Sequence, residues 1–152
     1  MSQKELQTTA TFHAPLVLIW EAWSNPEKIV HWWGPNGFTT TIQEMDFRED
    51  GEWNLILHGP DGTNYPNRSV YKEIIPLKKI AFEHFNPHFI TTVLFESNEE
   101  GTGMQWNMLF DSPEQYEVIV KAHKADEGQK QNIERLQNYI QQQLNEGKYR
   151  DG

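Results

Sequence analysis

Alternating apolar and polar side chains run through the middle of the chain, from residue 38 to residue 110. In residues 52–57, Trp53, Leu55 and Leu57 share one face, and residues 104–110 repeat this alternation with Met, Trp, Met and Phe. A period of two is that of a β-strand with one buried face. Together with a threonine-rich segment near the start, the pattern predicts strands at residues 6–13, 38–42, 52–57, 64–75, 79–85, 89–97 and 104–110.

Two helical patterns separate the first predicted strand from the others. Residues 16–23 carry apolar side chains at helical spacing after Pro15, a residue that suits a first helical turn. Asn25 is the expected N-cap of a second helix, with Pro26 as its first residue and Glu27 near the positive end of its dipole. We therefore expect two short helices at this point.

The C-terminal part of the chain is helical in pattern. Ser112 and Gln115 form a capping box with Pro113 at the first helical position, so a helix is expected to begin there. A break is expected near residues 126–128. Residues 129–144 form a polar helix with one apolar stripe, which consists of Ile133, Leu136, Ile140 and Leu144.

This order of elements predicts an α+β fold and a single domain over residues 1–152. An antiparallel sheet with one apolar face needs a cover, and only the C-terminal helix is long enough to supply it. We expect a curved antiparallel sheet of six or seven strands that wraps around this helix. No linker, repeat or low-complexity segment interrupts the pattern.

Charge and composition narrow the class of partner. The net charge of −9 argues against nucleic acid, which proteins bind through clustered basic residues. The absence of cysteine removes disulfides, thiol nucleophiles and cysteine-ligated metals. The apolar runs are too short to cross a membrane, and residues 1–7 lack the apolar core of a secretory signal. We expect a cytoplasmic protein, a monomer or homodimer, without nucleic acid or membrane insertion.

Residues 31–38, with the sequence HWWGPNGF, place two adjacent tryptophans before a stiff connection. Neighbouring side chains diverge on such a turn, so one ring should close the core while the other covers a rim or lines a cavity. Phe38 opens the next strand and needs a large partner inside. We therefore expect Trp33 to face the interior and Trp32 to lie more exposed at the rim.

These motifs together resemble the START-like (SRPBCC) superfamily. Within it, the chain is similar to the group named after homologues of the activator of the heat-shock protein 90 ATPase. The likeness extends over about residues 8–144. It rests on the segments FHAP (12–15), WEAWSNPE (20–27), WWGP (32–35), DFREDG (46–51), GPDG (59–62) and YKEI (71–74).

The resemblance implies a helix-grip fold, as in the birch-pollen allergen, with a cavity between the sheet and the C-terminal helix. It also implies that small hydrophobic molecules such as lipids, sterols and polyketides are bound or processed. Gly128-Gln129 departs from the usual glycine-tryptophan pair, which would widen or polarise one end of the cavity. Asp50-Gly51 replaces a double glycine found in many relatives, which would alter only a turn.

Four histidines are candidates for chemistry. His84 and His88 flank a predicted turn, and two imidazoles with one carboxylate can bind zinc. Glu83 would point away from His84, however, so we expect a surface pair and no metal site. His31 and His58 could each act as a general base. Their spacing pairs neither with an acid, and solvated positions are expected for both.

Asp46 and Arg48 share a strand face and can form an ion pair. Such a pair can orient a polar ligand, but we expect it to stabilise the turn into Gly51. The motifs of nucleophile-elbow hydrolases, phosphate-binding loops, dinucleotide sites and zinc proteases do not occur. Catalytic residues are therefore not assigned, and it remains open whether the chain is an enzyme.

One apolar set on the predicted sheet and helix suits a filled core and a pocket equally well. The resemblance favours a pocket, with His84 or Gln129 orienting the ligand. The candidate ligand-binding residues are Trp33, Trp53, Leu55, Tyr71, Phe82, His84, Val93, Phe95, Trp106, Met108, Gln129 and Ile133.

We expect this pocket to bind a small hydrophobic or amphipathic ligand, such as a lipid, a sterol or a polyketide-like molecule, and no cofactor. The first alternative is a polyketide cyclase or hydrolase of the same fold, with a histidine as its acid–base group. The second is a chaperone-associated regulator, with the chaperone as its partner, as the name of the group suggests.

Overall fold

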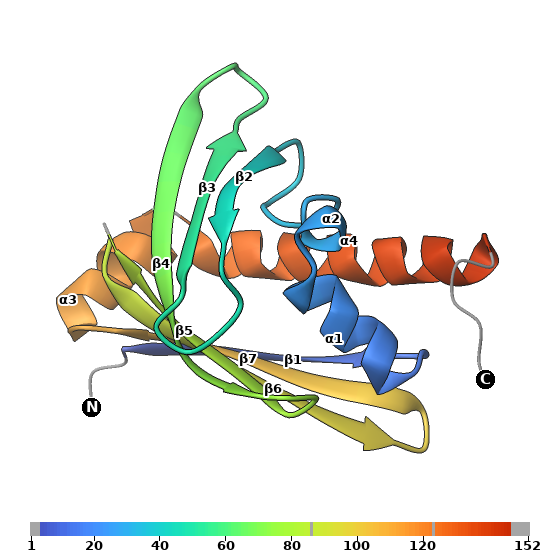
Figure 1. Cartoon of the computed structure of the whole chain (residues 1–152). Coiled ribbons are helices and arrows are strands. Elements are labelled where there is room, and N and C mark those ends of the chain that lie inside the picture. The colour runs from blue at the N-terminus through green and yellow to red at the C-terminus, as the bar shows by residue number, and fades with distance from the viewer. Residues whose placement is uncertain (1–3, 86, 123, 147–152) are drawn as a thin grey trace.

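A seven-stranded antiparallel sheet dominates the computed structural model, which describes residues 4–85, 87–122 and 124–146 (Figure 1). Neighbouring strands in the order β1-β7-β6-β5-β4-β3-β2 are hydrogen-bonded. The predicted strands are all present, with ends shifted by a few residues. They are β1 (Glu5–Phe12), β2 (Thr39–Met45), β3 (Glu52–His58), β4 (Asn64–Ile75), β5 (Lys79–Phe85), β6 (Phe89–Asn98) and β7 (Gly101–Phe110).

The helices lie between β1 and β2 and after β7. They are α1 (Leu16–Ser24), α2 (Pro26–Ile29), α3 (Pro113–Tyr116), the π-helical turn η1 (Glu117–Ala122) and the long α4 (Ala125–Asn145). Both predicted caps are confirmed. Asn25 Oδ1 accepts a hydrogen bond from the Glu27 amide at 2.9 Å, and Ser112 Oγ accepts one from the Gln115 amide at 3.1 Å.

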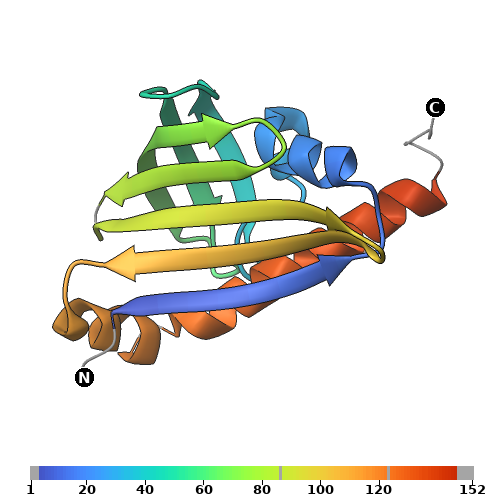
Figure 2. The same cartoon turned by 90° about the horizontal axis from the view of Figure 1, so that it is seen from below.

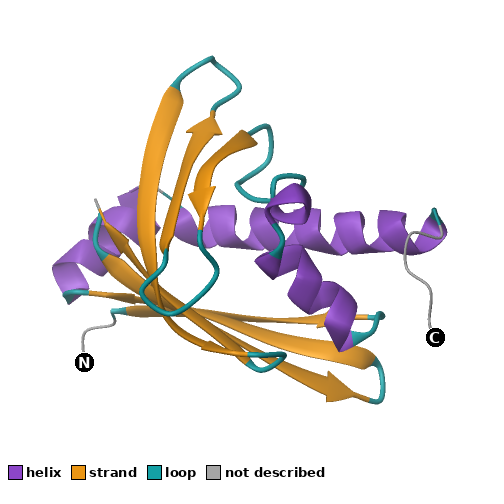
Figure 3. Ribbon diagram, in the orientation of Figure 1, coloured by secondary structure: helices purple, strands orange, loops and turns teal. Residues whose placement is uncertain are grey.

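The sheet is strongly bent, so that one face forms a trough (Figures 1 and 3). The strands β2, β3 and β4 stand steeply against β1, β7 and β6, and register shifts interrupt the β2–β3 and β4–β5 pairs. Such irregularities increase local bending. α4 runs along the concave side, so in the view from below it lies behind β1 and β7 (Figure 2). The predicted helix-grip arrangement is therefore confirmed.

The break before the last helix lies a few residues earlier than expected. α4 begins at Ala125, directly after Lys124, whose φ of 55° ends the preceding π-helical turn. Residues 126–128, where the sequence predicted the break, form the first turn of α4. Asp126 and Glu127 stabilise that turn because carboxylates interact well with the positive end of the helix dipole.

The core is built around Trp23 of α1. Its ring contacts the rings of Trp32, Trp33, Phe95 and Trp106 at centroid distances of 4.9–6.2 Å. Side chains from α4 and the sheet complete this cluster. In the described part of the chain, no helix is long and apolar enough to span a membrane.

The expectation for Trp32 is wrong, whereas Trp33 faces the interior and lines the cavity as expected. Trp32 is completely buried, and its indole N–H donates a hydrogen bond to the Ala22 carbonyl at 3.1 Å. Trp33 is only half-buried. The reason is that helical hydrogen bonding continues beyond α2, since the amides of Trp32 and Trp33 both donate to the Ile29 carbonyl. This backbone turns Trp32 towards α1 and Trp33 towards the sheet.

Candidate functional site

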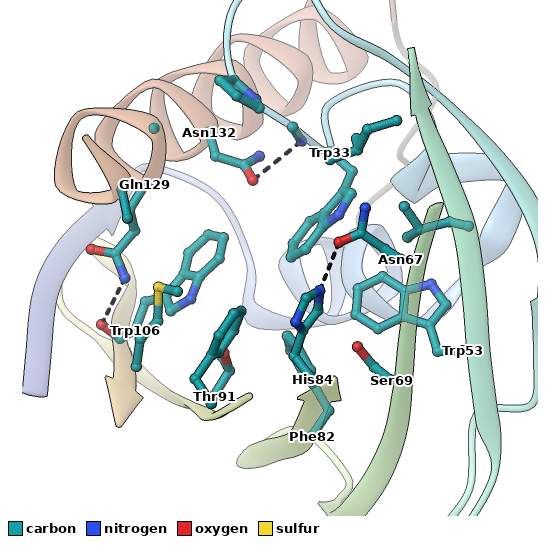
Figure 4. A pocket seen from close by; sticks show the side chains of 18 residues that line it. Trp33, Trp53, Asn67, Ser69, Phe82, His84, Thr91, Trp106, Gln129 and Asn132 are labelled. Carbon is teal, nitrogen blue, oxygen red and sulfur yellow. Dashed lines mark hydrogen bonds between the residues drawn. The ribbon is translucent and has the colours of Figure 1, made fainter. Parts of the chain in front are cut away.

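A cavity of about 170 Å³ lies between the concave face of the sheet and the first turns of α4 (Figure 4). Buried side chains of β3 to β7 form its floor. Half-buried side chains surround its opening, among them Trp33, Leu57, Phe89 and Met108. Among the described residues that line it, none is Lys, Arg, Asp or Glu.

Three tryptophans, two phenylalanines and one histidine contribute aromatic rings to the wall. Trp33 and Trp106 are nearly parallel, with 14° between their planes and 5.6 Å between centroids. Trp53 contacts Trp33 at 5.0 Å and meets Phe82 edge-on at 5.1 Å. These rings contact one another in the offset and edge-to-face geometries that aromatic side chains prefer. The wall is therefore held in a fixed shape.

His84 supplies a polar corner to this wall. Its Nδ1 lies 2.8 Å from the Pro87 carbonyl oxygen, and its Nε2 lies 2.6 Å from Asn67 Oδ1. Its ring stacks on Phe89 at 4.4 Å. Because a carbonyl only accepts, Nδ1 carries a proton. Burial lowers the pKa of His84 and so favours the neutral ring, in which Nε2 accepts; that state requires the Asn67 amide to turn so that Nδ2, not Oδ1, faces Nε2.

Two hydroxyl groups of the floor have no hydrogen-bond partner among the described residues. Ser69 of β4 is 4% exposed, and Thr91 of β6 is 1% exposed. Ser69 pairs with His84 across the β4–β5 ladder, so both side chains stand on the concave face, as Figure 4 shows. Neither hydroxyl oxygen is fully enclosed by protein atoms, so both open onto the cavity. Both groups line the cavity and are therefore available to a ligand.

Polar side chains of α4 hold the loop that carries Trp33. Asn132 accepts from the Gly34 amide at 3.2 Å and donates to the Trp32 carbonyl at 2.8 Å. Arg135 Nη1 donates to the carbonyls of Trp33, Gly34 and Pro35 at 2.9–3.2 Å. One side of the cavity is thus fixed to the long helix.

Gln129 performs a similar role at the other end of the cavity. Its amide N–H donates to the Trp106 carbonyl at 3.3 Å, and its amide oxygen accepts from the Thr8 hydroxyl. Both ends of this amide are therefore already bonded to the sheet. Gln129 lines the cavity, but it is less available to a ligand than Ser69 or Thr91.

Most of the residues predicted for ligand binding line this cavity, and the others lie in the core. Tyr71, Val93, Phe95 and Ile133 are buried without lining it. Tyr71 stacks on Trp53 and contacts Phe47 instead. The predicted residues that the structure brings together around the cavity are Trp33, Trp53, Leu55, Phe82, His84, Trp106, Met108 and Gln129.

Several lining residues were missed, although a signal for some of them exists. Asn67 and Ser69 alternate with Tyr71 along β4, and Thr91 alternates with Val93 along β6, so strand periodicity places them on the same face. Asn132 lies four residues before Leu136, in the stripe of α4 that faces the sheet. Their polarity led to their omission.

The other candidate groups lie outside the cavity. His88 bridges Glu83 Oε2 at 2.6 Å and Asp111 Oδ1 at 2.7 Å. These carboxylates raise the pKa of His88, Glu83 having the larger effect. No group of three or more metal-ligating side chains is found within residues 4–85, 87–122 and 124–146.

Asp46, Arg48, His31 and His58 all lie outside the cavity and contact other protein side chains. Arg48 Nε donates to Asp46 Oδ2 at 2.8 Å in an exposed ion pair. The adjacent turn requires glycine, because a Cβ at Gly51 would lie 1.9 Å from the Asp46 carbonyl oxygen. The His31 ring stacks on Tyr139, and His58 contacts Thr41 and Asn64.

Solved structures support this description of the fold. A protein from Nitrosomonas europaea superposes with a TM-score of 0.84 at 18% identity, covering 93% of this chain and 96% of that one. For a protein from Arthrobacter aurescens the TM-score is 0.85 at 23% identity, covering 91% and 86%. The AHSA1-like protein from Aeromonas hydrophila superposes with a TM-score of 0.74 at 17% identity, covering 90% of this chain and 92% of that one.

A comparison with curated proteins finds no match. A family model, described as activator of Hsp90 ATPase homolog 1-like protein, matches residues 13–141. This region contains α1, α2, β2 to β7 and most of α4, and so nearly all of the cavity wall. The chain therefore belongs to the family of activator of Hsp90 ATPase homolog 1-like (AHSA1) proteins.

Proposed function

We propose that the protein binds a small, uncharged, largely apolar molecule in the cavity between the sheet and α4. The observation that carries this proposal is a preformed hollow walled by aromatic rings, with two unpaired hydroxyl groups in its floor. Concave apolar sites with a few polar groups are typical of small-molecule binding. None of the described lining residues is Lys, Arg, Asp or Glu, so an ionic headgroup would find no counter-charge among them.

An enzyme of the same fold is a second candidate, because a buried histidine lies in the cavity wall. A general base must reach the proton that it abstracts. Both ring nitrogens of His84 are occupied by Pro87 and Asn67, and no hydrogen bond joins the ring to a hydroxyl among the described residues. These contacts favour binding over proton transfer.

A chaperone-associated regulator is a third candidate, and the description of the family favours it. Capture experiments can address it with the same protein sample. A chaperone retained by immobilised protein, with stimulation of its ATPase activity, would support this role. Neither result would bear on the cavity.

The proposal can be tested with a metabolite and lipid library in a thermal-shift assay, followed by product analysis of every hit. Gly128 offers a matched pair of variants, since it lines the cavity and a Cβ built there meets no atom within 4 Å. We expect hits that stabilise the wild type and Gly128→Ala but not Gly128→Phe, without turnover. Stabilisation that survives Gly128→Phe would place binding elsewhere, and turnover lost in His84→Gln would favour the enzyme.

A further inference from the structure

The charge of the cavity wall limits the class of ligand. None of its described lining residues is acidic or basic apart from His84, whose pKa is lowered by burial. Moving an ionised carboxylate or phosphate into such a site costs its hydration without supplying a counter-charge. Fatty acids and phospholipids therefore fit the cavity poorly.

The size of the cavity narrows the class further. A protein cavity of about 150 Å³ accepts benzene, and the volume here is about 170 Å³. One six-membered ring with a short substituent fills such a space, whereas the four fused rings of a sterol do not. The walls suit a flat ring, because Trp33, Trp53 and Phe82 already meet one another in aromatic pair geometries.

The polar corner indicates which group the ring carries. The hydroxyl of Ser69 opens onto the cavity beside His84 and has no partner among the described residues. A serine hydroxyl donates and accepts, and so does a phenolic hydroxyl, which is uncharged at neutral pH. A ligand hydroxyl placed here would give this hydroxyl a hydrogen-bond partner inside the cavity.

We propose that the cavity selects small uncharged phenols, whose single ring packs against the indoles while the hydroxyl hydrogen-bonds with Ser69. This inference rests on the proposed function and names the ligand class for the same cavity. It replaces the lipids, sterols and polyketides implied by the family resemblance with a smaller ligand. Thr91, on the other side of β5, is not required for it.

Five probes distinguish the effects of ligand charge, ligand size and the ligand hydroxyl group on binding. Each is titrated into the full chain and followed by two-dimensional ¹H–¹⁵N NMR. They are 4-ethylphenol, ethylbenzene, 4-ethylbenzoate, decanoate and estradiol. The indole N–H signals of Trp33, Trp53 and Trp106 report on the cavity, and that of Trp20, which does not line it, serves as the reference. We expect saturable shifts with 4-ethylphenol and affinity for ethylbenzene about 2- to 12-fold weaker, the equivalent of one hydrogen bond. We expect no saturable shifts with 4-ethylbenzoate, decanoate or estradiol.

Three variants locate the hydroxyl contact. Ser69→Ala should weaken 4-ethylphenol binding by about 2- to 12-fold and leave ethylbenzene unchanged, because it removes only the hydrogen bond. Thr92→Val, which changes a side chain on the opposite face of β6 and outside the cavity lining, is the matched control and should change neither affinity. Loss of phenol binding in Thr91→Val alone would contradict the assignment to Ser69.

The outcomes also separate this inference from the proposed function. Tighter binding of decanoate or estradiol than of 4-ethylphenol would overturn the phenol class while keeping a ligand in the cavity. Equal affinity for ethylbenzene and 4-ethylphenol would overturn the role of the hydroxyl. If none of the five probes binds, the phenol class is wrong, whereas the proposed function fails only if the library hits also ignore Gly128→Phe.

Discussion

The two adjacent tryptophans have different surroundings, so they should respond differently to truncation. Trp32 is fully buried with a bonded indole N–H, and Trp32→Ala should lower the free energy of unfolding by about 3–5 kcal/mol. Trp33 is half-buried beside the cavity, so Trp33→Ala should cost less and enlarge the binding space. Urea unfolding followed by circular dichroism measures both. Equal losses would mean that both rings belong to the core.

His84 and His88 should titrate on opposite sides of the ordinary histidine pKa of about 6.5. Burial lowers the pKa of His84, so its contribution to stability is lost as the pH falls below 6.5 and the unfolded chain takes up the proton. The carboxylates of Glu83 and Asp111 raise the pKa of His88, so its contribution is present below 6.5 and is lost as the pH rises through the raised value.

Histidine NMR titrations measure the two pKa values directly. Glu83→Gln should lower the pKa of His88 towards 6.5, because it removes the carboxylate with the larger effect, and should leave His84 almost unchanged. A pKa of His84 above that of His88 would contradict the burial of the first and the ion pairs of the second.

At the scale of elements, the contact between α4 and the tryptophan-bearing loop depends on polar side chains. Asn132→Ala would leave the Gly34 amide and the Trp32 carbonyl without their partner, at a cost of about 1–3 kcal/mol for each buried group. Asn138→Ala changes an exposed position on the same helix and serves as the matched control. Urea melts should show a large loss for the first variant and almost none for the second. Because alanine is the better helix former, a gain in stability for both variants would mean that the loop contact contributes little.

Replacing Gly128 by alanine should stabilise the protein, in contrast to the replacement of Asn132. Gly128 lies inside α4, where glycine costs about 1 kcal/mol relative to alanine, and a Cβ there meets no atom within 4 Å. Gly128→Ala should therefore raise the free energy of unfolding by about 0.5–1 kcal/mol in urea melts. A decrease would show that the helix needs the glycine at this point.

The elements themselves could largely be predicted from the sequence, because local rules decide them. Period-two alternation placed β3 and β7, and the caps at Asn25 and Ser112 placed two helix starts. The break before α4 was misplaced because Gly128 is tolerated within a helix when its neighbours Asp126 and Glu127 favour the first turn.

The candidate site was only partly predictable, because a cavity and a core present the same apolar face. Whether Phe82 lines a hollow and Phe95 fills the core depends on where α1 and α4 leave the sheet uncovered. The polar residues Ser69 and Asn132 look like surface positions in the sequence. Tertiary contacts alone place them inside.

At the scale of the whole molecule, the bend of the sheet creates the cavity. α1, which carries Trp23, fills one part of the trough, and α4 covers the rest. Gln129 of α4 is hydrogen-bonded to the sheet, and Asn132 and Arg135 are hydrogen-bonded to the loop that carries Trp33. The space that remains is small, aromatic and without charged walls. We therefore expect a ligand to bind at this one place in the fold.

Intermolecular nuclear Overhauser effects between 4-ethylphenol and the isotope-labelled protein test this assignment most directly. We expect contacts from the ligand ring to the Met108 methyl group and to the indoles of Trp33 and Trp106, which all line the cavity. Contacts confined to Tyr139, in the polar groove between α2 and α4, or no contacts at saturating ligand, would contradict it.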